Sequence, residues 1–423
     1  MAFDQLTLQD GPDAPSLADK FAAMCSEMEL CLPGLDQRSF AAMHYRFVID
    51  LFDNNFTLAS EGRLQDGESR EVTVVTNDEL RLLASQGKHP DGLFKLYPSD
   101  ETGRELQGKH ADDLAFDNFV ETLDLGFGQG LVSVQDMTPV QGKAVNRHKA
   151  GDTAAYLRAH RNMRLSSDHW PRNLLDLGGR VLGGVGGGIP EAFRTCPETS
   201  LLSLCIARTM VANDLQSLDK DSHKYESGMS PCCYWTLCAQ RGSSTMWHAD
   251  VLGGTWIRCL SGIKLWFICI GLDKEELEDF ARAGSAWSPP PQKVRCVVLY
   301  PGEILAMPPG QIWVHAPVTL TDCLMDGGMY WTVSRAESLL DSLEYIIEHY
   351  ETVTNEDPHQ DLVAVLDQLL CVLQALADTR DDIDMTTIRT RVNEVQDLHL
   401  RTMPARTRKR PLKQSNKRRA QRA

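Results

Sequence analysis

Between residues 233 and 332, short runs of β-forming residues alternate with turn residues, and this pattern limits the possible folds more than any other feature. The runs are rich in Val, Ile, Trp, Tyr and Thr, and Gly or Pro separates them. An antiparallel barrel or jelly roll requires such a pattern. It predicts strands at 233–240, 244–250, 254–260, 263–270, 294–299, 303–307, 313–318 and 323–331. The segment 273–292, helical and then Pro-rich, is predicted to be an insertion.

Helical spacing of apolar residues flanks this region on both sides. It covers 16–56 before the strands, and two leucine-rich stripes after Ser334 at 339–347 and 362–376. A mixed region with no legible site lies over 57–130, followed by a strand at 131–137 and a short helix at 153–162. The predicted class is α+β, with a jelly-roll core between an N-terminal α/β region and C-terminal helices. The expected parts are 1–130 (mixed α/β), 131–335 (catalytic domain), 336–400 (helical) and 401–423 (disordered basic tail).

Charge is distributed unevenly along the chain. The net charge is −15, but the last 23 residues hold ten Lys or Arg and no acid, so the first 400 residues carry −25. An acidic body repels phosphates, so DNA binding is expected only through the tail, whereas a basic peptide such as a histone tail would be attracted. The clusters 406–410 and 417–419 are spaced as in a bipartite import signal. They predict an import receptor as partner and a nuclear location, with the cytoplasm as the alternative.

Several functional classes are not expected. The longest uninterrupted apolar stretch, 265–270, is too short to span a bilayer. The start of the chain is acidic and lacks the features of a signal peptide. A soluble protein without a membrane partner is therefore predicted. Twelve cysteines without one C-x-x-C suit neither a zinc finger nor a disulfide scaffold, and favour a reducing compartment. The glycine-rich stretch 178–188 lacks the phosphate-loop pattern and is interpreted as a flexible loop.

A metal site is suggested by His248, Asp250 and His315. In a strand His248 and Asp250 would point to the same face, and His315 follows a Pro-Pro-Gly turn, 65 residues beyond Asp250, that would return it to the interior. Two imidazoles and one carboxylate form the facial triad that holds non-haem iron(II) and leaves positions open. Alone, H-x-D more often marks surface residues, and an isolated histidine more often belongs to a core.

Lys264 is a second candidate site residue. It stands among Leu, Trp, Phe, Ile and Cys in G-I-K-L-W-F, and burying a lysine is costly unless an anion meets it. The opposing interpretation is a solvent-facing lysine that protects a strand edge. Both interpretations remain open from this residue alone.

Taken together, three motifs resemble the core of the Jumonji C family of cupin-type oxygenases. They are S-S-T-M-W-H-A-D-V-L-G-G-T-W, then G-I-K-L-W, then P-G-E-I-L-A-M-P-P-G-Q-I-W-V-H. The elements at 254–256 and 327–330 look most like those of fungal members. The resemblance covers about 233–332, and W-P-R-N-L-L-D at 170–176 is similar to the approach strand of these domains.

The resemblance implies iron ligands at His248, Asp250 and His315, and contacts to the co-substrate 2-oxoglutarate at Lys264 and Thr245. It implies oxidative decarboxylation to succinate and carbon dioxide with dioxygen, and hydroxylation or demethylation of a protein side chain. Methyl-lysine on histones is the first expectation. Two departures put the substrate in doubt: many members with histone substrates carry Glu where Asp250 stands, and no zinc-binding reader module is visible.

Two other functions remain possible on the sequence. The first is a catalytically silent Jumonji-like scaffold that recruits chromatin partners. A complete triad plus a lysine argues against it, because a silent domain would be free to lose any one of the four. The second is a cupin that holds a different metal, in which Lys264 would have no role.

Overall fold

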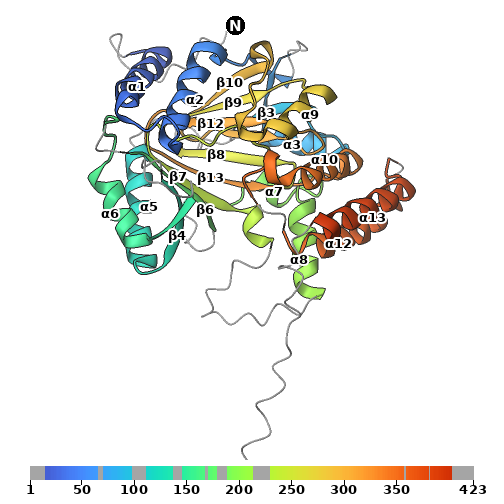
Figure 1. The fold of residues 1–423 in the computed structure, drawn as a ribbon. Coiled ribbons are helices and arrows are strands. Elements are labelled where there is room, and N and C mark those ends of the chain that lie inside the picture. The colour runs from blue at the N-terminus through green and yellow to red at the C-terminus, as the bar shows by residue number, and fades with distance from the viewer. Residues whose placement is uncertain are drawn as a thin grey trace, which may run out of the picture.

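The computed structural model describes residues 15–64, 70–97, 111–136, 145–166, 170–178, 188–212, 229–356, 359–380 and 382–402. These residues form an α+β fold, in which a large, mostly antiparallel sheet and a small sheet are surrounded by helices (Figure 1). The first 14 residues, most of the glycine-rich stretch and residues 403–423 lie outside the described part. None of the described helices is long and apolar enough to cross a membrane.

The large sheet combines strands from the N-terminal region with strands of the central region. Its order is β1 (Glu61–Arg63), β2 (Val72–Thr76), β3 (Leu93–Tyr97), β11 (Ile304–Met307), β8 (Thr255–Ser261), β13 (Cys323–Met329), β7 (Trp235–Ala239), β6 (Arg172–Gly178), β4 (Leu131–Asp136) and β5 (Val145–Lys149). The pairs β1–β2 and β2–β3 are parallel, and every other neighbouring pair is antiparallel.

The small sheet has the order β10 (Val294–Leu299), β9 (Lys264–Cys269) and β12 (His315–Thr319), all antiparallel. One buried cluster joins the two sheets, with Ile257 and Met325 from the large sheet and Trp266 and Ile268 from the small one. Because side chains alternate along a strand, these residues define the inward face of each sheet. We call the volume between them the intersheet space.

Helices surround the two sheets, and α12 and α13 among them pack on other helices. They are α1 (Leu17–Cys31), α2 (Phe40–Asn55), α3 (Asn77–Ser85), α5 (Ala111–Phe127), α6 (Ala150–Ala159), α7 (Glu191–Arg194), α8 (Leu201–Ala212), α9 (Lys274–Ala283), α10 (Ala336–Glu348), α11 (Tyr350–Val353), α12 (Leu362–Ala377) and α13 (Met385–Thr402). A capping box of Ser16 and Asp19 starts α1. The apolar stripes of α1 and α2 then pack on the small sheet, where Phe21 lies 6.1 Å from Phe267, centroid to centroid.

Seven of the eight strands predicted in the central region are present, as are α9 in the expected insertion and α10 and α12 at the leucine stripes. The strand predicted at 244–250 is wrong. This segment makes only two isolated bridges to β12, Ser244 to Val318 and His248 to His315. The two bridges differ by one residue in register, so an extra residue interrupts the ladder and no regular strand can form.

Candidate metal centre

The metal-site residues predicted from sequence lie together at the edge of the small sheet. His248 and His315 exchange backbone hydrogen bonds, with N···O distances of 3.0 Å and 2.9 Å. This paired bridge brings their imidazole rings to a centroid distance of 4.3 Å. His315 begins β12 opposite Ile268 of β9, and so faces the intersheet space. His315 therefore points to the interior, as the Pro-Pro-Gly turn before it predicts.

Asp250 reaches the two histidines from a turn instead of a strand. The N–H of Gly253 donates to the Asp250 carbonyl, which closes the turn before β8. A Cβ at Gly254 would lie 2.4 Å from the Tyr330 carbonyl oxygen, so only glycine permits this close approach of the two chains. The turn also lets Thr255 donate a 2.5 Å hydrogen bond to Asp250 Oδ2.

His248, Asp250 and His315 each offer a ligand atom, and these atoms all lie within 4.8 Å of one another. His315 Nε2 is 3.7 Å from Asp250 Oδ1. Among the residues that the structure describes, no other group of three His, Cys, Asp or Glu side chains meets this condition. The arrangement could hold a metal ion.

The hydrogen bonds of the two rings fix which nitrogen is available. His248 Nδ1 donates to the Met246 carbonyl at 2.8 Å, and His315 Nδ1 donates to the Trp313 carbonyl at 2.9 Å. A carbonyl only accepts, so each Nδ1 carries a proton, and in the neutral ring the lone pair therefore lies on Nε2. A backbone acceptor on the remote nitrogen is the usual support of a metal-binding histidine.

Burial, reinforced by the neighbouring His315, lowers the pKa of His248 to about 4. The ring is therefore neutral at pH 7, as a metal ligand must be. Asp250 Oδ2 is held by Thr255, which leaves Oδ1 directed to His315. The site thus offers two imidazole nitrogens and one carboxylate oxygen, a set that suits a borderline divalent transition metal.

Lys264 lies on the inward face of β9, and only 2% of it is exposed. Its ammonium donates to Thr319 Oγ1 at 2.7 Å, and this neutral hydroxyl is its one hydrogen-bond partner among the described residues. Burial lowers the pKa of Lys264. The alternative of a solvent-facing lysine at a strand edge is wrong, because β9 is the central strand of its sheet.

Thr245 is half-buried beside β12, and its N–H donates to the Pro317 carbonyl at 3.2 Å. Three residues that the sequence analysis did not select also belong to this region: Thr255, Thr319 and Trp266. Their roles depend on the pairing of β9 with β12 and on the Asp250 turn. The motif around Lys264 contained Trp266, but nothing local distinguished it from a core residue.

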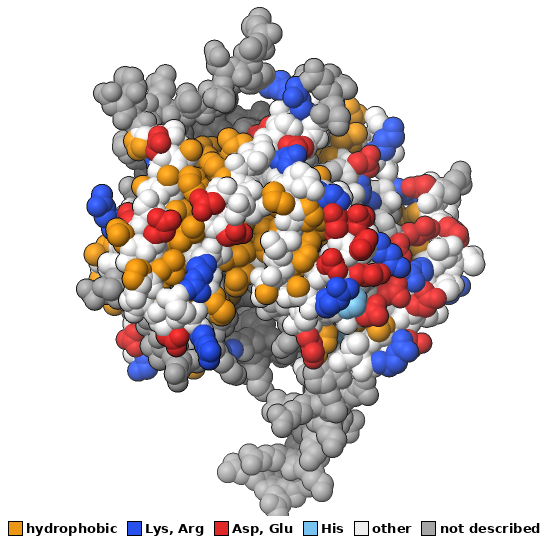
Figure 2. All heavy atoms as spheres, turned by 45° about the horizontal axis from the view of Figure 1, so that its top comes forward, with side chains coloured by type: hydrophobic (Ala, Val, Ile, Leu, Met, Phe, Trp, Pro, Cys, Tyr) orange, Lys and Arg blue, Asp and Glu red, His pale blue; other side chains and the backbone are white. Residues whose placement is uncertain are grey.

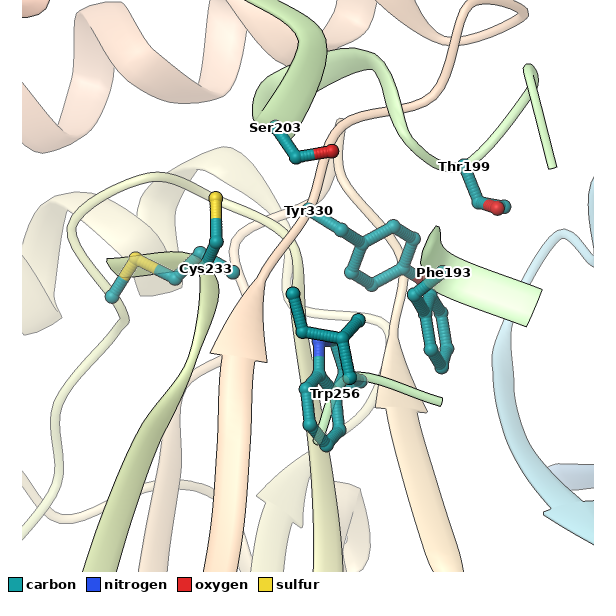
Figure 3. Close-up of a pocket in the computed structure, with 8 residues that line it drawn as sticks. Phe193, Thr199, Ser203, Cys233, Trp256 and Tyr330 are labelled. Atoms are coloured by element: carbon teal, nitrogen blue, oxygen red, sulfur yellow. The ribbon is translucent and has the colours of Figure 1, made fainter. Parts of the chain in front are cut away.

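A small pocket lies elsewhere, on the outer face of the large sheet (Figure 3). Trp256, Tyr330 and Phe193 form its aromatic wall, and Ser203 approaches from α8. Trp256 points away from the intersheet space, because its neighbour Ile257 points into it. This pocket is therefore separate from the metal centre.

Comparison with known proteins gives a limited result. No family model matches the chain. A curated relative, "KK-1 biosynthesis cluster protein D" of Curvularia clavata, is 41% identical over 102 residues. The match spans 24% of this chain and only 10% of that relative's length, so it shows a local similarity of sequence.

Proposed function

We propose that the protein is an iron(II)- and 2-oxoglutarate-dependent oxygenase of the Jumonji C type. The observation that carries the proposal is the cluster of His248, Asp250 and His315 at the edge of the intersheet space. Two histidines and one carboxylate are the ligand set of non-haem iron(II) oxygenases.

The residues present fit iron(II). In the neutral form of each ring the lone pair lies on Nε2, because Nδ1 donates its proton to a backbone carbonyl. The carboxylate of Asp250 is restrained by Thr255, so one of its oxygens remains for the metal. Three protein ligands would leave positions for a chelating co-substrate and for dioxygen.

We further propose that the two sheets form a double-stranded β-helix. The order β11–β8–β13–β7 in one sheet and β10–β9–β12 in the other supports this. From β8 to β13 the chain crosses to the other sheet after each strand, except between β9 and β10, which form a hairpin within the small sheet. The bridged segment 244–248 adds to the edge of β12 and takes the place of the missing strand. Such a barrel holds its site between the sheets, where His315 and Lys264 both face.

The co-substrate pocket is proposed along the inward face of β9. Lys264 and Thr319 are register partners, as are Ile268 and His315, so the ammonium and the metal ligands lie at opposite ends of one face. The ammonium lacks an acidic partner among the described residues and would bind the distal carboxylate of 2-oxoglutarate. Thr245 would donate its hydroxyl to the same group.

Iron(II), 2-oxoglutarate and dioxygen bound together would supply an oxidant that hydroxylates a C–H bond, with release of succinate and carbon dioxide. The residues of the site hold the metal, orient the dicarboxylate and keep its charge away from water. A protein side chain is the proposed substrate, and histone methyl-lysine is the first candidate. Hydroxylation of an N-methyl group releases formaldehyde, so the same chemistry would demethylate the lysine. The acidic body of the chain suits a basic peptide.

A second candidate substrate is an intermediate of a biosynthetic cluster. The name of the relative, a biosynthesis cluster protein, favours it, although the match covers 10% of that protein. The chemistry at the metal would be the same, and only the group that receives oxygen would differ.

Succinate formation tests the function without knowledge of the substrate. Purified protein is incubated with Fe(II), ascorbate, 2-oxoglutarate and air, and succinate is measured by NMR. We expect slow uncoupled turnover that increases when a methylated histone peptide is added, and none in His248→Ala. Equal succinate from wild type and His248→Ala would contradict the proposal.

A further inference from the structure

Trp266 carries a buried hydrogen-bond donor that nothing in the described structure satisfies. Its side chain is 3% exposed, and its indole Nε1 has no acceptor among the described residues. A buried donor without an acceptor costs about as much free energy as a lost hydrogen bond, so such groups are rare in native proteins. A ligand bound beside this donor would supply the missing acceptor.

Two other buried tryptophans have acceptors for their indole N–H groups. The N–H of Trp313 donates to the Pro308 carbonyl at 2.7 Å, and that of Trp331 donates to the Leu252 carbonyl at 3.0 Å. The Pro308 carbonyl belongs to the loop between β11 and β12, and the Leu252 carbonyl belongs to the turn that follows Asp250. Trp266 differs from both, because its indole N–H has no acceptor among the described residues.

The position of Trp266 places it between the two functional ends of β9. It follows Lys264 by two residues and precedes Ile268, the register partner of His315, by two. All three therefore share the inward face of the strand. The ring of Trp266 also stacks on that of His315, with centroids 5.4 Å apart and an interplanar angle of 21°.

The polar groups of this face have an excess of donors. Lys264 brings a positive charge whose described partner is a neutral hydroxyl, and Trp266 brings a second N–H. The Thr319 hydroxyl that accepts from Lys264 is itself 3.0 Å from Ser243 Oγ. A face with two donors and no carboxylate of its own between Lys264 and Ile268 favours an anionic ligand rich in acceptors.

We propose that Trp266 is a positioning and specificity residue whose indole N–H donates to a carboxylate oxygen of the bound dicarboxylate. The proposal rests on the function proposed above and adds a donor to Lys264 and Thr245. The stacked ring holds His315, and the N–H in the same plane holds the co-substrate. One side chain thus aligns the metal ligand and the dicarboxylate.

Trp266→Phe is the informative substitution, because it removes the N–H and keeps an aromatic ring against His315. Calorimetry with Zn(II)-loaded protein, which does not turn over, gives the dissociation constant for 2-oxoglutarate. We expect wild type to bind 2-oxoglutarate and Trp266→Phe to bind it roughly tenfold to a hundredfold more weakly, as for a lost hydrogen bond to a charged group. Zinc affinity should stay within a few-fold of wild type. Trp287→Phe, a change in the outer cluster on the helices, is the matched control and should bind normally.

Two further measurements separate a ligand contact from a merely structural role. The indole N–H resonance that is missing in Trp266→Phe should move downfield when 2-oxoglutarate is added to wild type. Without ligand, Trp266→Phe should lose less thermal stability than Trp331→Phe, because only the latter leaves a carbonyl without its donor.

The possible failures are distinguishable. If wild type binds 2-oxoglutarate and Trp266→Phe binds it equally well, the role of Trp266 is wrong and the proposed function stands. If wild type with zinc does not bind 2-oxoglutarate at all, the co-substrate pocket fails, and this inference fails with it. An unmoved indole resonance in a saturated wild-type complex would also overturn the inference, because the donor would then be bonded to something else.

Discussion

The charge of Lys264 is the strongest constraint on any ligand at the scale of single residues. An ammonium that is buried against a neutral hydroxyl is unfavourable in the ligand-free protein, and the lowered pKa expresses that cost. We expect Lys264→Ala to weaken 2-oxoglutarate binding by roughly 2–5 kcal/mol while iron binding persists. Calorimetry on wild type and on Lys264→Ala measures the affinities for 2-oxoglutarate and for iron. Unchanged affinity for 2-oxoglutarate would refute the pocket.

Lys95 provides the matched control, since it is equally buried but fully paired. Its ammonium lies 2.7 Å from Glu61 and 3.2 Å from Glu303. Lys95→Ala should leave these carboxylates without a cation and cost about 3 kcal/mol of folding free energy, with 2-oxoglutarate affinity unchanged. Lys264→Ala should show the opposite pattern, with lost affinity and little lost stability. Urea denaturation supplies the stabilities.

His44 links the folding free energy to pH. It is fully buried, its Nε2 donates to the Gly242 carbonyl at 3.0 Å, and burial lowers its pKa to about 4. Above pH 6.5 the ring is neutral in the folded and unfolded states. Between pH 6.5 and about 4 only the unfolded state takes up the proton, so stability falls as pH falls, by about 3 kcal/mol in total.

His44→Gln keeps a donor and removes the titration. Urea denaturation at pH 7 and pH 4.5 should therefore show a smaller loss of stability in this variant than in wild type. Burial also lowers the pKa values of His89 and His248 to about 4, so these residues still cause part of the loss of stability at low pH in the variant. Identical losses in the two proteins would contradict the assignment to His44.

At the scale of elements, the turn before β9 determines where Lys264 falls. Gly262 has a φ of +78°, and a Cβ there would lie 2.2 Å from the Asp322 carbonyl oxygen. Gly262→Ala should therefore destabilise the fold by more than about 1 kcal/mol and lower 2-oxoglutarate affinity. Gly271→Ala isolates the backbone cost, because Gly271 has a φ of +66° and an added Cβ would meet no atom within 4 Å. Equal losses in both variants would show that the close approach to Asp322 is unimportant.

The elements also explain which features could be predicted from the sequence. Strands with regular alternation and Gly or Pro turns were found, because those signals are local. The irregular segment 244–250 was mistaken for a strand, because a one-residue shift against β12 depends on the partner and leaves no local mark. The parallel pairing of β2 with β3, which extends the sheet into the N-terminal region, is likewise a non-local choice.

The same limit applies to the candidate site. His248, Asp250 and His315 were selected because their spacing and the hairpin around His315 are visible in the sequence, and the structure brings them together. Thr319 and Thr255 were missed, because one depends on the register of β12 with β9 and the other on the turn after Asp250. Chemically distinctive residues could be predicted, but ordinary residues that support them could not.

At the scale of the whole molecule, the net charge is negative over the first 400 residues and positive over the last 23. Acidic side chains gather on one side of the face drawn in Figure 2. Exposed acids of the described helices include Glu278 in α9 and Asp341 in α10. The basic residues after Leu400 lie almost wholly outside the described part. We keep the prediction that they form an import signal recognised by an import receptor.

Fusion of residues 401–423 to a reporter should move it into the nucleus, and a chain ending at Leu400 should remain in the cytoplasm. If the tail instead binds nucleic acid, it should confer DNA affinity that falls steeply with salt. A chain ending at Leu400 that still enters the nucleus without a partner to carry it would show that the tail is not the import signal.

The most direct test of the account is the visible spectrum of the protein with Fe(II) and 2-oxoglutarate in the absence of oxygen. A 2-oxoglutarate chelate at a site of two histidines and one carboxylate gives a weak charge-transfer band. It needs the triad, the metal and the co-substrate together, and no knowledge of the substrate. We predict the band in wild type, its loss in His315→Ala, and its appearance in Lys264→Ala only at higher 2-oxoglutarate concentration. Wild-type protein that binds iron and shows no band at saturating 2-oxoglutarate would contradict the proposed oxygenase.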